Sequence, residues 1–417
     1  MRTTIQKLAI ITLTLFSTTV QAQEFDKYFE DRTLRLDYIF AGDSAHQAIY
    51  LDSPISMPRW YGRRHRLSEL PLKGNGRITV RDLNDGTVIY RNSFSTLFQE
   101  WLATSEAKHT SRSFENVFLV PYPKKTVSIT VELQDSHDRN IAVLTHTIDP
   151  KDILIRHAGE KNITPHTTFR QATDTTRCIH ITYIAEGYTD EEMNAFLEDV
   201  RTADEAMFAH EPFKTMKDRF HITAVMSPSH DSGTSEPAGG LWKNTALGSH
   251  FDTFYSDRYL TTLRLKRLHD LLAGTPYEHI IVLVNTKKYG GGGIYNSYNL
   301  SYTGGDNFKP VVVHEFGHSF GGLGDEYEYG DDDPMYFADT EPWEPNLTTM
   351  HNFKDKWENL ISVKKAGLFE GGGYQSKGVF RGSENCRMRT NDVQEFCPVC
   401  RQALTRLIEF YTEKGTD

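Results

Sequence analysis

Two histidines and a glutamate in the stretch HEFGH supply the residue types that a hydrolytic metal site needs. His314 and His318 are four residues apart, so on a helix their imidazoles leave the same face about one turn apart and can share one metal ion. Glu315 emerges beside that face, where it can deprotonate a metal-bound water without being a ligand. The spacing predicts a zinc site in which the histidines bind and the glutamate reacts.

A zinc ion that catalyses hydrolysis keeps three protein ligands and one open position, so a third donor is required. Gly321, Gly322 and Gly324 follow the second histidine, and such a cluster ends a helix and lets the chain reverse towards the metal. We expect Asp325 to be the third ligand, and Glu326 is the neighbouring alternative.

The stretch HEFGHSFGGLGDEY resembles the metal site of the M64 peptidases, the family named for an immunoglobulin A peptidase. The likeness covers roughly residues 160 to 412, behind an N-terminal module of similar type. It also includes Gly187-Tyr188, Gly290–Gly293, Trp357 and the Cys386–Met388 region. The resemblance implies a metzincin-like zinc endopeptidase with Met388 in a methionine turn beneath the metal. Gly324 stands where the commonest metzincin pattern has its third histidine, so the next residue must serve as ligand.

Four glycines, Gly290–Gly293, precede a short predicted strand, Ile294–Tyr298, and leave the backbone without side chains in the way. Such a stretch suits an exposed strand edge that pairs with an extended peptide, although a loop without a ligand is the alternative. The position ahead of the zinc helix and the family resemblance favour substrate binding. We expect the substrate to contact Gly291, Gly292, Gly293, Ile294 and Tyr295.

The 417 residues suggest two domains behind an export signal. Residues 1–22 have the charged, apolar and small-residue regions of a signal peptide, which predicts a periplasmic or secreted protein. Alternating apolar residues predict an all-β sandwich over 24–150, including a hairpin turn at Asn84-Asp85-Gly86. This domain either packs against its neighbour or binds a carbohydrate or protein.

Residues 151–168 have little periodicity and are expected to be a linker. Residues 169–417 alternate strand and helix patterns, which predicts an α/β (α+β) catalytic domain. The expected strands are Cys178–Ala185, Phe220–Met226 and His279–Val284. Three helices are expected. One starts at a Thr189-Asp190 cap and runs to Phe208, and the others span Leu260–Leu272 and Phe396–Glu413.

The four cysteines include the pair Cys397 and Cys400 in the stretch CPVC. A second pair with zinc spacing is missing, which argues against a four-cysteine zinc site. Since export favours oxidation, we expect Cys386 to form a disulfide with Cys397 or Cys400, and Cys178 to be a buried thiol.

A net charge of −10 argues against nucleic acid as a partner, because no basic field is present to meet phosphate. The apolar run near the N-terminus is short for a membrane span, so membrane insertion is not expected. The acidic stretch Glu326–Asp333 has the carboxylates that Ca²⁺ prefers, but such runs are usually solvated loops, and we assign no calcium site.

These observations predict an exported zinc-dependent endopeptidase that acts on proteins or peptides, with one catalytic Zn²⁺ and Glu315 as general base. Two other functions remain open: a zinc amidase acting on cell-wall or glycan amides, and a non-catalytic binding protein that is stabilised by zinc. The glycine-rich edge favours peptides over the amidase substrates.

Overall fold

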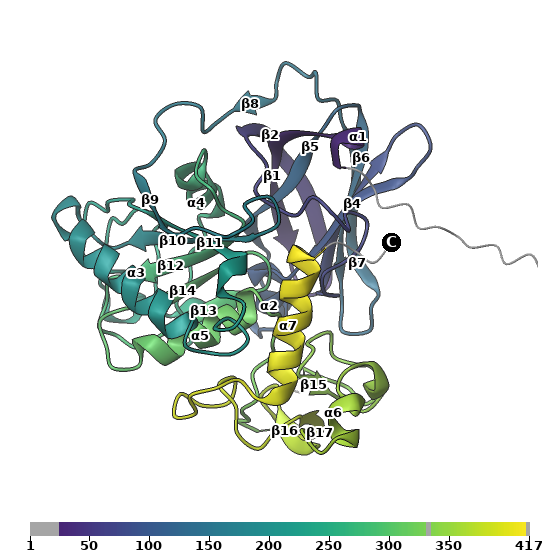
Figure 1. Cartoon of the computed structure of the whole chain (residues 1–417), viewed down its shortest axis with the longest axis vertical. Helices are drawn as coiled ribbons and strands as arrows, with labels where there is room; N and C mark the ends of the chain where they lie inside the picture. Colours follow the sequence, from purple (N-terminus) through teal and green to yellow (C-terminus); the bar gives the residue numbers. More distant parts are fainter. Residues whose placement is uncertain (1–24, 331–334, 414–417) are drawn as a thin grey trace, which may run out of the picture.

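The computed structural model describes residues 25–330 and 335–413, which form an N-terminal β part and a mixed α/β part (Figure 1). The predicted signal peptide lies outside the described residues, as do Asp331, Asp332 and Asp333 of the acidic stretch.

The N-terminal part contains two four-stranded sheets, ordered β5-β1-β2-β8 and β4-β3-β6-β7. Neighbouring strands are antiparallel except β2 and β8. A short helix, α1 (Phe25–Tyr28), precedes the first strand. The strands are β1 (Phe29–Gly42), β2 (Gln47–Pro58), β3 (Gly76–Asp82), β4 (Val88–Phe94), β5 (Arg112–Pro123), β6 (Val127–Gln134), β7 (Asn140–Ile148) and β8 (Arg156–His157).

The two N-terminal sheets share one apolar core. Phe94 of β4 stacks on Phe118 of β5, with ring centroids 4.2 Å apart. The alternating side chains of β6 that point inward are buried, as the period of two predicts. The hairpin predicted around Asn84-Asp85-Gly86 joins β3 to β4, and it is confirmed. The segment expected to be a linker contains β8 and the first residues of β9 (His166–Arg170).

The second part is built on a six-stranded sheet of order β13-β14-β12-β10-β11-β9. The four inner strands are parallel, and β13 and β9 run antiparallel at the two edges. The inner strands are fully buried or nearly so, as expected for a sheet covered on both faces. The remaining bounds are β10 (Ile179–Glu186), β11 (Phe220–Val225), β12 (His279–Val284), β13 (Gly291–Ile294) and β14 (Tyr298–Tyr302).

Helices α3 (Met193–Met207), α5 (Phe308–Ser319) and α7 (Pro398–Thr412) share a core with one face of this sheet (Figure 1). Residues of α4 (Leu265–Leu272) belong instead to the core that includes the N-terminal sheets. A mixed α/β architecture behind a β domain therefore matches the expectation. The predicted helix Leu260–Leu272 was too long, because Leu260 and Thr261 make backbone hydrogen bonds to Gly291 and His250 instead.

Between α5 and α7 the chain forms a small antiparallel sheet of order β15-β17-β16, beside α6 (Glu358–Ser362). Its strands are β15 (Leu347–Thr348), β16 (Phe369–Gly372) and β17 (Gln375–Arg381). The segment 325–328 reaches this sheet through a bridge between Glu328 and Tyr374. The residues that follow the histidine pair are therefore attached to the small sheet, which comes later in the chain.

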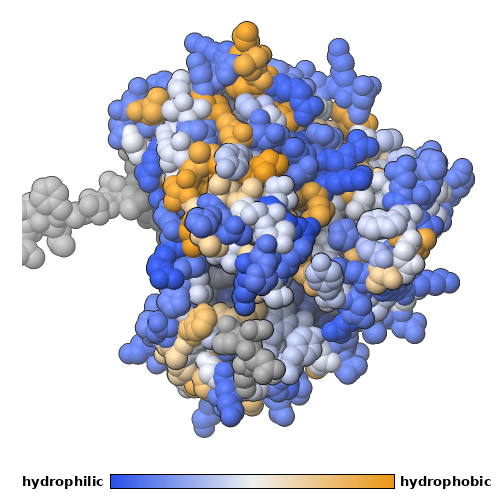
Figure 2. All heavy atoms as spheres, turned by 180° about the vertical axis from the view of Figure 1, so that it is seen from behind, coloured by the Kyte–Doolittle hydropathy of each residue, from blue (hydrophilic) through white to orange (hydrophobic). Residues whose placement is uncertain are grey.

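Figure 2 shows the face opposite to that of Figure 1, where hydrophobic residues concentrate on the upper half and hydrophilic residues cover most of the rest. Among the residues that the structure describes, no helix has the length and apolar character needed to cross a membrane.

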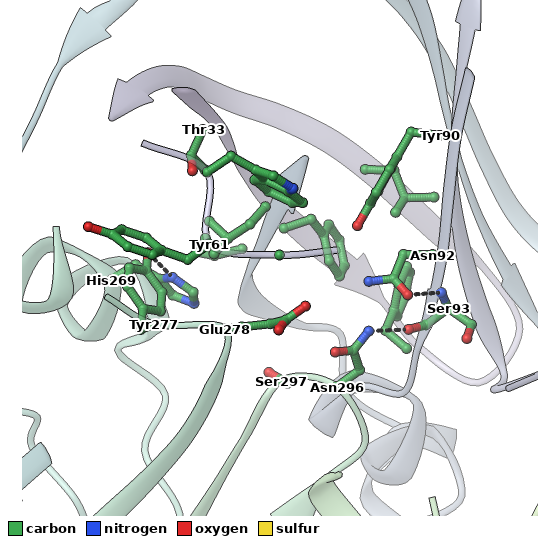
Figure 3. Close-up of a pocket in the computed structure, with 17 residues that line it drawn as sticks. Thr33, Tyr61, Tyr90, Asn92, Ser93, His269, Tyr277, Glu278, Asn296 and Ser297 are labelled. Atoms are coloured by element: carbon green, nitrogen blue, oxygen red, sulfur yellow. Dashed lines mark hydrogen bonds between the residues drawn. The ribbon is translucent and has the colours of Figure 1, made fainter. Parts of the chain in front are cut away.

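A cavity of about 50 Å³ lies where the N-terminal part meets the α/β part (Figure 3). Glu278 points into it, with Tyr90 and Asn92 across the space. None of the predicted zinc-site residues lines this cavity. Burial raises the pKa of Glu278 to about 8, although the Arg63 charge opposes the rise, and Oε2 of Glu278 has no hydrogen-bond partner. This carboxyl therefore favours its neutral form.

Glu278→Gln is expected to stabilise the protein at alkaline pH. The unfolded chain releases this proton near pH 4.5, whereas the folded chain keeps it to about pH 8, so the wild type loses stability as pH rises across this window. The free energy of unfolding of the variant, measured by urea denaturation, should exceed that of the wild type at pH 8.5 by about 2–4 kcal/mol, and the difference should shrink towards pH 5. Replacing the exposed Glu30 by Gln is the control. A gap that is independent of pH would contradict the prediction.

Candidate metal centre

Helix α5 carries the histidine pair, and its local sequence explains both ends. Asn307 precedes the helix, and the buried residues Val311, Val312 and Val313 lock the first turns into the core. At the other end the N–H of Gly322 donates to the carbonyl of His318 over 2.9 Å, with Gly322 at a φ of 58°. This left-handed cap ends the helix and turns the chain back.

The turn places two groups at His318. The carbonyl of Leu323 accepts a hydrogen bond from Nδ1 of His318 over 2.6 Å, and Asp325 arrives beside both imidazoles. Oδ1 of Asp325 lies 3.0 Å from Nε2 of His314 and 3.3 Å from Nε2 of His318. The two Nε2 atoms are 3.0 Å apart. The predicted reversal through the glycines thus brings Asp325 to the histidines.

These three atoms fit a tetrahedral zinc ion. Bonds of about 2.0–2.1 Å at tetrahedral angles separate two ligand atoms by about 3.3 Å, close to the spacing found here. The side chains of His314, His318 and Asp325 are 13%, 16% and 7% exposed. The trio is therefore largely shielded yet reachable, as a site with one open position requires.

The hydrogen bonds of the histidines fix which nitrogens face the centre. Nδ1 of His314 donates to the carbonyl of Arg387 over 3.1 Å, and Nδ1 of His318 donates to Leu323. A carbonyl can only accept, so in the neutral rings the proton is on Nδ1 and each Nε2 offers a lone pair. Oδ1 of Asp325 is also an acceptor, and it has no hydrogen-bond donor. In the neutral rings three lone-pair atoms converge, so His314, His318 and Asp325 could hold a metal ion.

The electrostatics of the trio favour positive charge at the centre, whether it is a proton or a metal ion. Burial lowers the pKa of His318, but the Asp325 carboxylate outweighs it and raises that pKa to about 10. Burial opposes ionisation of Asp325, yet the His318 charge holds its pKa well below the usual range. The centre therefore attracts positive charge strongly.

Glu315 leaves α5 beside the trio and lies under the glycine-rich strand β13. Burial raises the pKa of Glu315, while the charges of His314 and His318 oppose the rise. A Cβ placed on Gly291 would lie 2.5 Å from Oε1 of Glu315, and one on Gly293 would lie 2.6 Å from the Glu315 carbonyl oxygen. Glycine is needed at both positions because the strand packs directly on the glutamate.

The residues predicted to contact substrate fall into two groups. Gly291, Gly292 and Gly293 form the edge strand of the sheet, next to Glu315. Ile294 and Tyr295 are 1% and 3% exposed, so their side chains belong to the core. Any contact of these two residues with a substrate would have to be made by the backbone.

Met388 is fully buried, and it lies against α5 directly before His318. A Cβ on Gly317 would come within 2.7 Å of the sulfur of Met388. The carbonyl of Met388 accepts from the N–H of Glu326 over 2.8 Å. The segment that contains Arg387 and Met388 therefore supports both His314 and the loop that carries Asp325 and Glu326.

Two residues near the centre were not found from the sequence. The hydroxyl of Tyr374 donates to Oδ2 of Asp325, which orients the carboxylate. Glu100 comes from α2 (Leu97–Leu102) of the N-terminal part and accepts a hydrogen bond from Tyr259. Burial raises the pKa of Glu100 to about 7, with the Tyr259 donor opposing, and the charges of the centre act on it too. No spacing rule links these residues to the histidines.

Glu326, the alternative third ligand, is not part of the trio. Its carboxylate is fully buried and lies with the sulfurs of Cys386, Cys397 and Cys400. The structure pairs none of the four cysteines, so the predicted disulfide between Cys386 and Cys397 or Cys400 is wrong. Cys178 is a buried thiol, as expected.

Comparison with known families covers nearly the whole described chain. A family model described as IgA Peptidase M64 matches residues 168–366 and 362–408, and a model described as Peptidase M64 N-terminus matches residues 24–145. No curated protein matches the chain. The first match includes the histidine pair, Glu315, Asp325 and the Cys386–Met388 segment. The chain therefore belongs to the IgA peptidase M64 family, and it is a peptidase.

Proposed function

We propose that this protein is an exported, zinc-dependent endopeptidase in which Glu315 is the general base and the fold around the metal is metzincin-like. One observation carries the proposal: Nε2 of His314, Nε2 of His318 and Oδ1 of Asp325 converge at mutual distances of 3.0–3.3 Å. Glu315 projects beside them without a role in binding the metal. The charged, apolar and small-residue regions over 1–22 support export.

Zinc held by these three side chains would polarise the scissile carbonyl and lower the pKa of the attacking water. Glu315 accepts the proton of that water and then returns it to the leaving amine. The raised pKa of Glu315 suits both steps, because the carboxyl takes up a proton more readily than an exposed glutamate does. Tyr374 holds Asp325 in the orientation that ligation needs.

The substrate would align along β13 in an extended conformation. The N–H and carbonyl of Gly291 already bond the carbonyl of Arg258 and the N–H of Leu260, over 3.3 and 3.1 Å. Gly293 is then the next position along this edge strand at which a peptide backbone could pair. An amide bond flanked by further residues on both sides fits such a strand better than a small amide does.

The direct test is incubation of the metal-replete mature protein with a peptide library, followed by mass spectrometry of the products. We expect internal peptide bonds to be cut, activity to disappear with 1,10-phenanthroline, and zinc to restore it. A parallel incubation with cell-wall fragments tests the amidase function. Cleavage of cell-wall amides but of no peptide, or full activity in the presence of the chelator, would refute the proposal.

A further inference from the structure

A second cluster of metal-binding side chains lies next to the catalytic centre and has no part in the proposed reaction. It consists of Glu326, Cys386, Cys397 and Cys400, whose ligand atoms lie within 4.8 Å of one another. Their exposure is 4% or less. Thiols and carboxylates are both donor types that bind Zn²⁺.

The spacing of the cluster fits a tetrahedral ion. Sulfurs bound at about 2.3 Å to one zinc are separated by about 3.8 Å. Sγ of Cys386 and Sγ of Cys400 are 3.7 Å apart, and Oε1 of Glu326 is 3.1 Å from the sulfur of Cys400 and 4.0 Å from that of Cys397. A disulfide would join two of the three sulfurs and leave the third thiol beside a buried carboxylate. One ion satisfies all four groups.

Backbone N–H groups point at the sulfurs, as they do where thiolates bind a metal. Sγ of Cys386 accepts from the N–H of Cys397 over 3.2 Å and from that of Met388 over 3.5 Å. Sγ of Cys397 caps helix α7 and accepts from the N–H of Cys400 over 3.5 Å. The start of a long helix favours a negatively charged sulfur. The C-x₂-C spacing of this pair is that of a zinc-binding turn.

The carboxylate of Glu326 has a fixed direction and one unpaired oxygen. The side-chain amide of Asn346 donates to Oε1 over 2.9 Å and to the carbonyl of Gly324 over 2.9 Å, which fixes the direction of the side chain. Oε2 is buried without a hydrogen-bond partner. A buried carboxylate with an unpaired oxygen is costly unless a cation compensates it.

We propose that Glu326, Cys386, Cys397 and Cys400 bind a second Zn²⁺ with a structural role. This ion would fix two segments that build the catalytic centre. Asp325 and Glu326 are adjacent, and successive side chains of an extended segment point to opposite sides, so one binds each ion. Cys386 precedes Arg387, whose carbonyl orients His314, and Met388, which packs under α5.

Metal analysis of the full mature chain tests this inference. After dialysis against zinc-free buffer, we expect two zinc ions per wild-type chain and one in Cys400→Ser, with all thiols of the wild type free by mass spectrometry. Protein loaded with Co²⁺ should show a thiolate-to-cobalt charge-transfer band in the wild type and in His318→Ala, and lose it in Cys400→Ser. The band reports the cysteine site alone, so it does not depend on the proposed peptidase mechanism.

The matched control is Cys178→Ser, a buried cysteine outside the cluster, which should keep both ions and the band. If Cys400→Ser does not fold, Glu326→Gln replaces it and should also bind one zinc ion fewer than the wild type. The number of free thiols in the wild type tests the same site without any variant. A wild type with one zinc ion and a disulfide between two of the clustered cysteines would overturn the inference. Free thiols without the cobalt band would overturn it as well. A wild type that binds both ions but cleaves no peptide would count against the proposed function only.

Discussion

Replacing Glu315 by Gln is expected to lower kcat on casein about 10³-fold while zinc remains bound. The substitution keeps the shape of the side chain and removes its ability to take a proton. Glu315 is not among the atoms that converge on the metal position, so the three ligands stay in place. Steady-state kinetics with parallel zinc analysis and near-UV circular dichroism measures both halves of this expectation.

The same substitution at the exposed Glu198 of α3 is the control, and it should leave kcat and zinc content unchanged. Activity of Glu315→Gln within tenfold of the wild type would exclude Glu315 as the proton acceptor. If the wild type also had no activity on any amide, the zinc-stabilised binding protein would become the better hypothesis. The Glu315 variant therefore separates an enzyme from a binding module.

The trio of His314, His318 and Asp325 could be predicted because its determinants are local in sequence. The four-residue spacing of His314 and His318 requires only a helix, and Gly322 requires only a left-handed turn that returns the chain. Asp325 follows within one short segment. The edge position of β13 was also predictable from its glycines, although the closest neighbour of Gly291 and Gly293 is Glu315 rather than open solvent.

The remaining parts of the site depend on contacts between distant segments. Tyr374 reaches Asp325 from the small sheet, and Glu100 reaches the centre from the N-terminal part. The cysteine cluster was not found for the same reason. Its fourth member, Glu326, is a carboxylate 60 residues ahead of Cys386, so the search for a second cysteine pair could not find it. The expectation of oxidation then favoured a disulfide that the structure does not contain.

Asp325→Ala is expected to lose the zinc ion of the histidine pair and, with it, the peptidase activity. Removing a residue that only orients a ligand weakens metal binding about 10–100-fold, so removing the ligand itself should cost more than about 100-fold. Oδ1 of Asp325 is the one acidic atom facing both Nε2 atoms in the described cluster, and no other residue of that cluster can replace it. Zinc analysis after dialysis against a chelating buffer should find one ion fewer than in the wild type.

Tyr374→Phe provides a graded comparison, because it removes only the hydroxyl that donates to Oδ2 of Asp325. Its zinc affinity should fall between those of the wild type and Asp325→Ala, and added zinc should restore activity. Asp355→Ala makes the same change as Asp325→Ala at an exposed position and should bind zinc as the wild type does. If Asp325→Ala held zinc at the histidines within tenfold of the wild-type affinity, Asp325 could not be the third ligand. A group other than Asp325 would then have to complete the site, because two histidines leave a catalytic zinc ion one protein ligand short.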